Sequence, residues 1–245
     1  TAYWTVTARN AAGQLTGERF RPGSTGGYTY QPETGRLTGT TVRGANGATF
    51  SDVSYHYYPT GNLAGRDDNY LHRYNSYCYD SLHRLVDWRI TATPVAPSAG
   101  CPPPDTTIIR TTYGYNAIGD LTAETFPENG QPATVRYGYG GTGQSPHWMT
   151  SRTGPGGAST PYSYDAAGRQ VAGDGRSNSY NTNNLPTSIT TTPGGEQNLF
   201  GYDAVGNLTA RTDRRGETTD FMFDARNRIV RRLEPLLTGE VGERR

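Results

Sequence analysis

One short phrase recurs along this chain in nearly the same letters. Residues 201–209 read GYDAVGNLT, and related runs at 163–171, 114–122 and 9–16 read SYDAAGRQV, GYNAIGDLT and RNAAGQLT. A catalytic motif has no reason to be written several times, whereas a structural joint appears once in every unit of a repeat protein. The phrase therefore predicts a repeat architecture in which each copy is a joint between paired elements.

The copies align on an aromatic residue that precedes an acid, an amide or a short polar run. Most intervals between these aromatic residues fall between 21 and 25 residues, so the repeat unit is about 22 residues long. Most units carry a second aromatic residue two positions earlier, and residues i and i+2 point to the same face of a strand. Each unit is thus expected to present a pair of rings on one face of a sheet. The aligned positions are Tyr30, Tyr57, Tyr79, Tyr115, Tyr139, Tyr164, Tyr180, Tyr202 and Phe223.

A tight turn is predicted directly after the aligned aromatic residue. In the best copies an aspartate follows it, and its short side chain can bond the backbone two residues further on. Four residues after the aromatic stands a residue suited to positive φ, either glycine or asparagine. The chain then resumes as a strand, so each unit is predicted to be a β-hairpin. These turn residues are Asp165, Asp203 and Asp224, followed by Gly61, Gly119, Gly168, Gly206, Asn184 and Asn227.

Together these features predict an all-β protein made of consecutive antiparallel β-hairpin repeats in one long sheet. Because each strand twists relative to its neighbour, the sheet should coil into a spiral, as an arc of a shell or a barrel. No stretch shows helical periodicity. We expect a single repeat array over residues 1–234, with a proline-rich loop insertion at 91–107 and a C-terminal tail at 235–245. The residues predicted to carry the repeat structurally are Tyr115, Gly119, Tyr164, Asp165, Gly168, Tyr202, Asp203, Gly206, Phe223 and Asp224.

Composition limits the classes of function. The hydrophobic fraction is only 33%, but 18 tyrosines favour buried faces built from Tyr and Thr over disorder. A net charge of +1 predicts no affinity for nucleic acid or anionic membranes. All 23 basic residues are arginine. Either arginine is used because its guanidinium stacks on the tyrosine rings, or a GC-rich genome explains the absence of lysine. No apolar run is long enough for a membrane span, and the opening TAYWTVTARN lacks the pattern of a signal peptide, so we expect a piece of a longer protein.

The best copies of the phrase resemble the YD repeats of Rhs proteins, of the B and C components of Tc insecticidal toxins, and of teneurins. The resemblance rests on YDAAGRQV, YDAVGNLTART, YNAIGDLTAET and FDARNRIVRRLE, and the weaker copies YDSLHRLVDW and YNTNNLPTSI extend it over nearly the whole chain. It implies a spiral β-sheet that winds into a hollow shell, which in bacterial members encloses a C-terminal toxin domain. The family's core-associated stretch has no counterpart in this sequence, and about ten hairpins predict an arc of wall.

The two cysteines suggest a link between the loop insertion and the sheet. Cys78 lies between Tyr77 and Tyr79, and Cys101 lies in the proline-rich loop. A disulfide between them would close a loop of about 22 residues, stabilise the fold by about 3 kcal/mol and place the protein outside the cytosol. The alternative is two unrelated free thiols.

The sequence shows no constellation of catalytic or metal-binding residues. The run GQSPH at 143–147 lacks the closing glycine of a nucleophile elbow. Asp67, Asp68 and Asn69 lack the spacing of an EF-hand, so a solvated loop is favoured over a Ca²⁺ site. We therefore predict no catalytic residue, no cofactor and no metal. The histidines are scattered and follow no zinc-site spacing: His56, His72, His83 and His147.

The predicted function is non-enzymatic: a shell or scaffold segment of a large secreted or surface bacterial protein, which encloses or presents another polypeptide such as a toxin domain. The alternative is an extracellular adhesin or carbohydrate-binding module, because exposed tyrosine rings can stack on sugars. Cross-repeat packing explains the regular spacing of the rings better. The expected partners are other parts of a parent polypeptide, an enclosed toxin, glycans, or further copies joined through unpaired edge strands.

Overall fold

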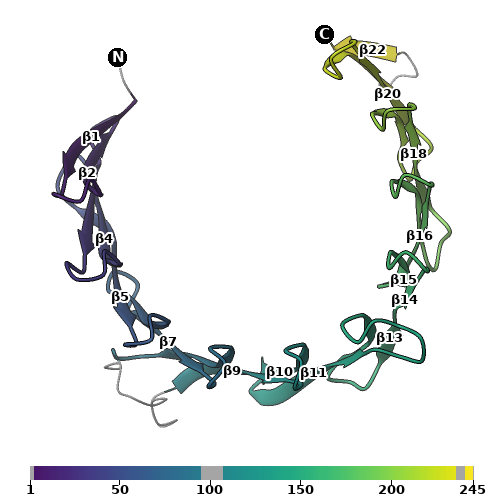
Figure 1. The fold of residues 1–245 in the computed structure, drawn as a ribbon. Coiled ribbons are helices and arrows are strands. Elements are labelled where there is room, and N and C mark those ends of the chain that lie inside the picture. Colours follow the sequence, from purple (N-terminus) through teal and green to yellow (C-terminus); the bar gives the residue numbers. More distant parts are fainter. Residues whose placement is uncertain (1–2, 95–106, 236–240, 245) are drawn as a thin grey trace. The chain divides into compact units, whose positions relative to one another are not determined.

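The computed structural model describes residues 3–94, 107–235 and 241–244, and β-strands joined by turns make up these ranges without any helix. The chain divides into two compact units, residues 1–135 and 136–245, which are described separately. The strands form two sheets, and in each sheet successive strands pair antiparallel and follow the order of the chain (Figure 1). The prediction of an all-β protein made of consecutive antiparallel hairpins is confirmed. No helix in the described ranges has the length and apolar character of a membrane span.

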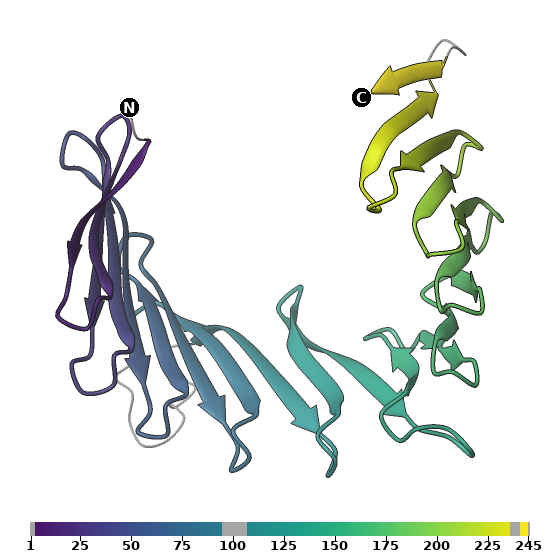
Figure 2. The ribbon, with the colours of Figure 1, turned by 45° about the horizontal axis from the view of Figure 1, so that its top comes forward.

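The first unit is a ladder of hairpins that lie side by side in one layer (Figure 2). Aromatic, Thr and Val residues suit the pleated backbone of its strands, and Gly, Asn and Asp residues close the turns. Its strands are β1 (Trp4–Arg9), β2 (Leu15–Phe20), β3 (Thr25–Tyr30), β4 (Leu37–Arg43), β5 (Thr49–Tyr57), β6 (Leu63–Asp68), β7 (Arg73–Tyr79), β8 (Leu85–Thr91), β9 (Thr107–Tyr115) and β10 (Leu121–Glu128). Strand β11 (Gln131–Tyr139) runs from the first unit into the second.

The second unit repeats the same pattern with shorter strands. They are β12 (Met149–Thr153), β13 (Ser159–Pro161), β14 (Ser163–Tyr164), β15 (Gln170–Gly173), β16 (Arg176–Tyr180), β17 (Pro186–Thr191), β18 (Gln197–Tyr202), β19 (Leu208–Thr212), β20 (Thr218–Phe223), β21 (Ile229–Pro235) and β22 (Val241–Arg244). β22 pairs with β21 and lies in the segment predicted to be a tail. The predicted boundaries of the repeat array stay a prediction.

The backbone ladder is divided within the second unit, where the sequence predicted one continuous sheet. Strands β1 to β13 form one sheet and β14 to β22 form the other. Tyr162 N–H still donates to the carbonyl of Thr150 on β12 at 3.0 Å, but Ser163 already pairs with Ala172 on β15. Pro161, directly before this change of partner, has no N–H to donate to a ladder. The chain therefore leaves one sheet and enters the next within a few residues.

Few side chains are fully buried, as expected for a single layer. In the first unit the most buried apolar residues are Cys78, Val135 and Val53, which are 1%, 2% and 4% exposed. A buried ion pair lies on β8 of that unit, where Arg89 Nη2 contacts Asp87 Oδ2 at 2.8 Å. In the described part of the second unit, Tyr162 is the one large apolar side chain that reaches full burial. Most of the stabilisation must therefore come from contacts between neighbouring hairpins.

Candidate functional site

The turn after each repeat tyrosine is closed by the side chain that follows it. Asp165 Oδ1 accepts hydrogen bonds from the backbone N–H groups of Ala167 and Arg169, both at 3.0 Å. Asp165 N–H donates to the carbonyl of Arg169 at 3.0 Å, and Gly168 N–H donates to the carbonyl of Asp165 at 2.9 Å. Gly168 has a φ of +80°, which lets a three-residue loop rejoin the strand with a bulge. The polar groups of this turn are thus satisfied locally.

The same pair of side-chain bonds recurs along the chain. The structure places Asp203 and Asp224 in such turns, as it does Asp165. Sequence reasoning did not single out the other caps, although an Asx residue directly after the aligned aromatic residue, or five residues before a leucine, was the available signal. The following residues cap their turns in this way: Asn10, Asp80, Asn116 and Asn181.

The capping aspartates are held in their ionised form. The Asn207 side chain, together with nearby backbone N–H groups, lowers the pKa of Asp203 below its ordinary value. The Arg228 guanidinium lowers the pKa of Asp224 in the same way. Desolvation alone would raise the pKa of Asp165, but hydrogen bonds from Arg169 outweigh it and lower the pKa. These carboxylates are therefore engaged in closing turns and are poor candidates for proton transfer near neutral pH.

The residue after the positive-φ position links each turn to the next. Arg169 Nε donates to Asp165 Oδ2 at 2.7 Å within its own turn. Its Nη1 then donates to the carbonyl of Asn181 at 3.0 Å and to Asn184 Oδ1 at 2.9 Å in the following turn. The same guanidinium lies 4.8 Å from the centre of the Tyr180 ring, a cation–π contact. One side chain therefore closes its own hairpin and holds the next one.

Other turns make equivalent links with different side chains. Arg84 Nη1 donates to the carbonyl of Asn116 at 3.1 Å, and its guanidinium lies 4.7 Å from the centre of the Tyr115 ring. Where tryptophan replaces arginine, the Trp148 ring stacks on the Tyr164 ring with centroids 5.1 Å apart. These contacts support the interpretation that arginine serves packing here, since the guanidinium is flat and pairs with both rings and carbonyls.

Hydroxyl groups of the repeat tyrosines form a second set of links, in the opposite direction along the chain. Tyr202 Oη donates to the carbonyl of Pro186 at 2.9 Å, and Tyr180 Oη donates to the carbonyl of Gln170 at 2.9 Å. Each acceptor lies at the start of the strand that follows the preceding turn. We call these bonds tyrosine staples. Further staples join Tyr30 to Leu15, Tyr57 to Leu37 and Tyr115 to Leu85, each at 2.9 Å.

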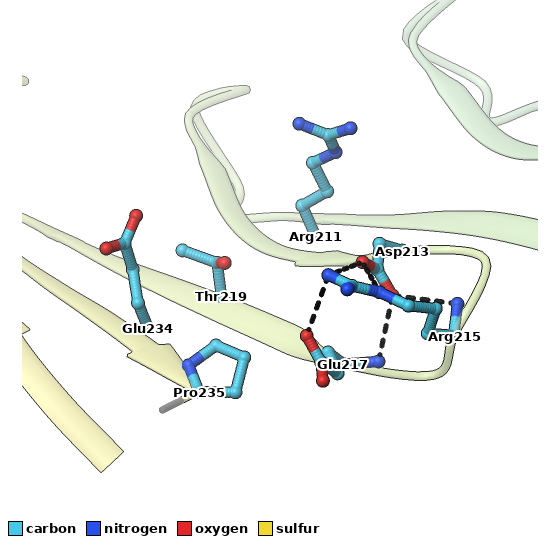
Figure 3. Close-up of a pocket in the computed structure, with 7 residues that line it drawn as sticks. All are labelled: Arg211, Asp213, Arg215, Glu217, Thr219, Glu234 and Pro235. Atoms are coloured by element: carbon cyan, nitrogen blue, oxygen red, sulfur yellow. Dashed lines mark hydrogen bonds and ion pairs between the residues drawn. The ribbon is translucent and has the colours of Figure 1, made fainter. Parts of the chain in front are cut away.

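A separate feature is a pocket at the turn between β19 and β20, which lies at the opposite end of β19 from the turn of Asp203. Its volume is about 240 Å³, and Asp213 caps this turn as the other Asx residues cap theirs. Figure 3 shows Arg215 bonded to both Asp213 and Glu217, while Arg211 extends away from this network. Glu234 of β21 lies on the far side of the pocket. The pocket therefore holds both charge signs.

Part of the chain that contains these repeated turns matches a known family of repeats. Residues 180–218 and 202–236 each match the family model described as RHS Repeat. These are the residues that carry the turns of Asn181, Asp203 and Asp224 together with the staple of Tyr202. Together the two matches cover residues 180–236. The same capped turn also occurs outside the matched residues, from Asn10 onwards. No curated protein matches the sequence at a significant level.

Solved structures show the same fold. The crystal structure of TcdB2-TccC3-TEV matches with a TM-score of 0.60 and 21% identity, over 94% of this chain and 12% of that chain. That of TcdB2-TccC3 matches with a TM-score of 0.60 and 20% identity, over 93% of this chain and 12% of that chain. These proteins are Tc toxin components, so the resemblance to YD-repeat proteins of the Rhs and Tc type is confirmed. The chain spans 12% of the length of either relative.

The predicted disulfide involves one residue that the structure describes. Cys78 lies on β7 and is 1% exposed, and no free cysteine occurs among the described residues. Cys101 and most of the proline-rich loop lie outside the described residues. The pairing of Cys78 with Cys101 therefore stays a prediction.

The expectation of a solvated loop at residues 67–69 is wrong. Asp67 and Asp68 end strand β6 and are 7% and 9% exposed. His56 Nε2 lies 2.9 Å from Asp67 Oδ2, and Asp68 Oδ1 accepts a bond from Leu71 N–H at 2.9 Å. The two carboxylates can be buried because these partners form hydrogen bonds with them. The partners come from the fold and cannot be recognised from the sequence of residues 67–69 alone. Within the described ranges no three potential metal ligands gather at one place.

Proposed function

We propose that this chain is a segment of wall in a larger Rhs-type polypeptide and that the wall encloses or presents another polypeptide, such as a toxin domain. Its role is mechanical: it supplies a thin and continuous surface instead of a reaction. The scaffold relationship to the Tc proteins supports this proposal, as does the resemblance of the repeat phrase to proteins whose sheets wind into shells.

The observation that carries the proposal is the coupling between neighbouring hairpins. Neighbouring repeats are bound together by tyrosine staples and by side chains that cross between turns. In a repeat array such nearest-neighbour terms decide stability, because a single hairpin is too small to be stable alone. A wall that must stay closed around a second polypeptide needs this kind of lateral coupling.

We propose a non-enzymatic protein because the groups that recur have structural partners. The capping aspartates accept bonds from their own turns, and the repeat tyrosines that form staples donate their protons to backbone carbonyls. We further propose that the protein works outside the cytosol, at a cell surface or as a secreted protein. The predicted disulfide between Cys78 and Cys101 supports this localisation, since disulfides persist in oxidising compartments.

Small-angle X-ray scattering on the purified chain tests the wall. A single-layer sheet should scatter as a plate about 10 Å thick. Its radius of gyration should lie well above the roughly 18 Å of a compact domain of this length. A radius of gyration near the compact value, together with a thickness of two or more layers, would refute the proposal.

An extracellular carbohydrate-binding surface is the alternative, and the half-buried tyrosine rings favour it to the extent that they remain accessible. Arginine contacts on the rings of Tyr115 and Tyr180 occupy faces that a sugar would need. A glycan array separates the two functions. Reproducible binding of one sugar that is lost on mutating one local tyrosine cluster would favour the carbohydrate-binding surface over the wall.

A further inference from the structure

A second and larger pocket adjoins the one in Figure 3 and crosses β16 to β19. Its volume is about 700 Å³, and it shares Arg211, Asp213 and Arg215 with the smaller pocket. All of its lining residues come from the second unit and lie within residues 176–215. Asp213 caps the turn at one end of this pocket, but the lining residues outside this turn belong to no capped turn or tyrosine staple described above, so their chemistry requires a separate explanation.

The pocket gathers more arginines than its acids can pair. Arg215 is bonded to Asp213 and Glu217, as Figure 3 shows. The remaining three guanidinium groups of the lining are exposed, and none of them has an ion-pair partner in the part of the chain that the structure describes. These three are Arg176, Arg211 and Arg214. Because arginine stays charged at every physiological pH, the pocket carries unpaired positive charge.

The floor of the pocket is apolar. Ile189 of β17, Phe200 of β18 and Leu208 of β19 line it, and all three remain half-buried in a sheet that has a single layer. Phe200 pairs directly with Arg211 across the ladder, so an aromatic ring and a guanidinium stand side by side on the same face. A ligand that fits must therefore place apolar groups and carboxylates on one of its own faces.

We propose that this pocket, here called the arginine pocket, binds an extended acidic segment of a partner polypeptide. The bound segment carries aspartate or glutamate at positions i and i+4 and an aliphatic residue at i+2, because side chains two apart share a face in an extended chain. The acids pair with the free guanidinium groups, which bind carboxylates in a fork, and the aliphatic side chain covers Ile189 and Phe200. This inference rests on the proposed function, since it names the chemistry of the polypeptide that the wall holds.

The lining favours a peptide over other polyanions. Asp213 lies in the pocket, and Glu217 and Glu234 line the adjoining one, so a continuous phosphate backbone would meet three carboxylates. An acidic sugar would stack on an accessible aromatic side chain of the protein, whereas two of the three apolar residues that line this pocket are aliphatic. Carboxylates spaced along a peptide and separated by apolar side chains match this alternation of charge and apolar surface.

Fluorescence anisotropy with labelled peptides tests the inference on the full chain. The probe is Asp-Ser-Leu-Ser-Asp-Ser-Leu-Ser-Asp, which places its acids and leucines on one face. A control peptide of identical composition, Asp-Leu-Asp-Leu-Asp-Ser-Ser-Ser-Ser, places the leucines on the opposite face from the acids. A third peptide replaces Asp with Asn. We expect the first peptide to bind at least about tenfold more tightly than either control, and its affinity to fall with added salt.

Matched variants locate the binding. Arg176→Gln combined with Arg211→Gln should weaken binding of the first peptide at least about tenfold. Arg226→Gln removes an exposed arginine in the turn at the other end of β20 and should leave the affinity within about twofold. All these arginines are exposed, so circular dichroism should show unchanged β-structure in each variant.

Three outcomes would overturn the inference: equal binding of all three peptides, an affinity that the double variant does not change, or tighter binding of an oligogalacturonate than of the peptide. The first two would leave the wall intact if scattering still shows a plate about 10 Å thick. Failure of the arginine pocket and failure of the proposed wall are thus distinguishable.

Discussion

Removing one tyrosine hydroxyl tests whether the staples hold neighbouring hairpins together. In Tyr202→Phe the ring stays in place, but the bond to the carbonyl of Pro186 is lost. A neutral hydrogen bond contributes about 1 kcal/mol net, and the half-buried setting of this one lets water partly replace it. We therefore expect a loss of about 0.5–1 kcal/mol in the stability of this repeat, a factor of about two to five in its opening equilibrium.

Native-state hydrogen exchange is the suitable assay because contacts in a repeat array are local. Amides of β17 to β19 should exchange faster in Tyr202→Phe, while amides of the first unit should be unchanged. Tyr70→Phe is the matched control, since Tyr70 is 49% exposed and its hydroxyl has no hydrogen-bond partner among the described residues. If Tyr202→Phe changes local exchange no more than this control does, the reasoning is refuted.

The last repeat offers the reciprocal experiment. Phe223 occupies the staple position but lacks the hydroxyl, and the equivalent acceptor is the carbonyl of Leu208, which follows Asn207 as Pro186 follows Leu185. Phe223→Tyr should therefore add a staple and slow exchange in β19 to β21 by a similar factor. A general effect of hydroxyl groups would also give opposite signs, so Tyr70→Phe, which removes a hydroxyl that forms no staple, is the control for both substitutions.

Three further predictions address the turns and the cysteines. Gly168→Ala should cost more than Gly119→Ala by urea midpoint: both residues have positive φ, but an added Cβ meets Trp148 at 2.8 Å at Gly168 and nothing within 4 Å at Gly119. Equal losses would show that only backbone strain matters, about 1–2 kcal/mol. The free energy of unfolding should fall as the pH drops through the lowered pKa values of the capping aspartates, because the unfolded chain takes up protons first; a urea midpoint as high at about pH 2.5 as at neutral pH would contradict this. Reduction of the intact protein should raise its mass by about 2 Da if Cys78 and Cys101 are paired, whereas alkylation of both without reductant would show free thiols.

Sequence reasoning located the hairpins because their signals are local. An Asx side chain bonds the backbone within its own turn, and glycine or asparagine at positive φ needs no distant partner. Asn184 and Asn227 indeed have φ values of 63° and 59°. The turns on the other edge were detectable by the same logic, since Asn129-Gly130 and Asp174-Gly175 are typical of type I′ hairpins and were not singled out.

The contacts between repeats were not readable in the same way, because they depend on how neighbouring hairpins align. The sequence around Tyr180 does not predict that its hydroxyl donates to the carbonyl of Gln170. The buried ion pair of Arg89 with Asp87 is likewise invisible until strand register brings Arg110 to the same carboxylate at 2.7 Å. The change of sheet at Tyr162 arises from one proline and a buried ring, which no repeat pattern predicts.

The residues of the repeat phrase vary from copy to copy, and contacts between successive turns explain part of this variation. In several described turns, the residue whose carbonyl accepts the hydrogen bond that closes the turn lies against the positive-φ residue of the next turn. Where that next residue is glycine, the side chain above it is polar in some turns and apolar in others. The polar side chains Gln14 and Arg36 lie over Gly35 and Gly61, whereas Leu185 lies over Gly206 and Trp148 lies over Gly168. Glycine is required there for two reasons, since a Cβ at Gly168 would meet the indole at 2.8 Å and the backbone has positive φ.

Where asparagine or histidine replaces glycine, the residue above it is one that can hydrogen-bond. Arg169 donates to Asn184 at 2.9 Å, and Asn207 donates to Asn227 at 3.0 Å. In the described turns a side chain at the positive-φ position thus has a polar partner from the preceding turn, whereas glycine occurs with either a polar or an apolar partner. The two residues lie about one repeat apart in the sequence but contact each other. A copy that departs from the repeat phrase is therefore matched by the contacting residue of the copy before it. This pairing lets neighbouring hairpins of the sheet keep a lateral contact while the phrase changes from one repeat to the next.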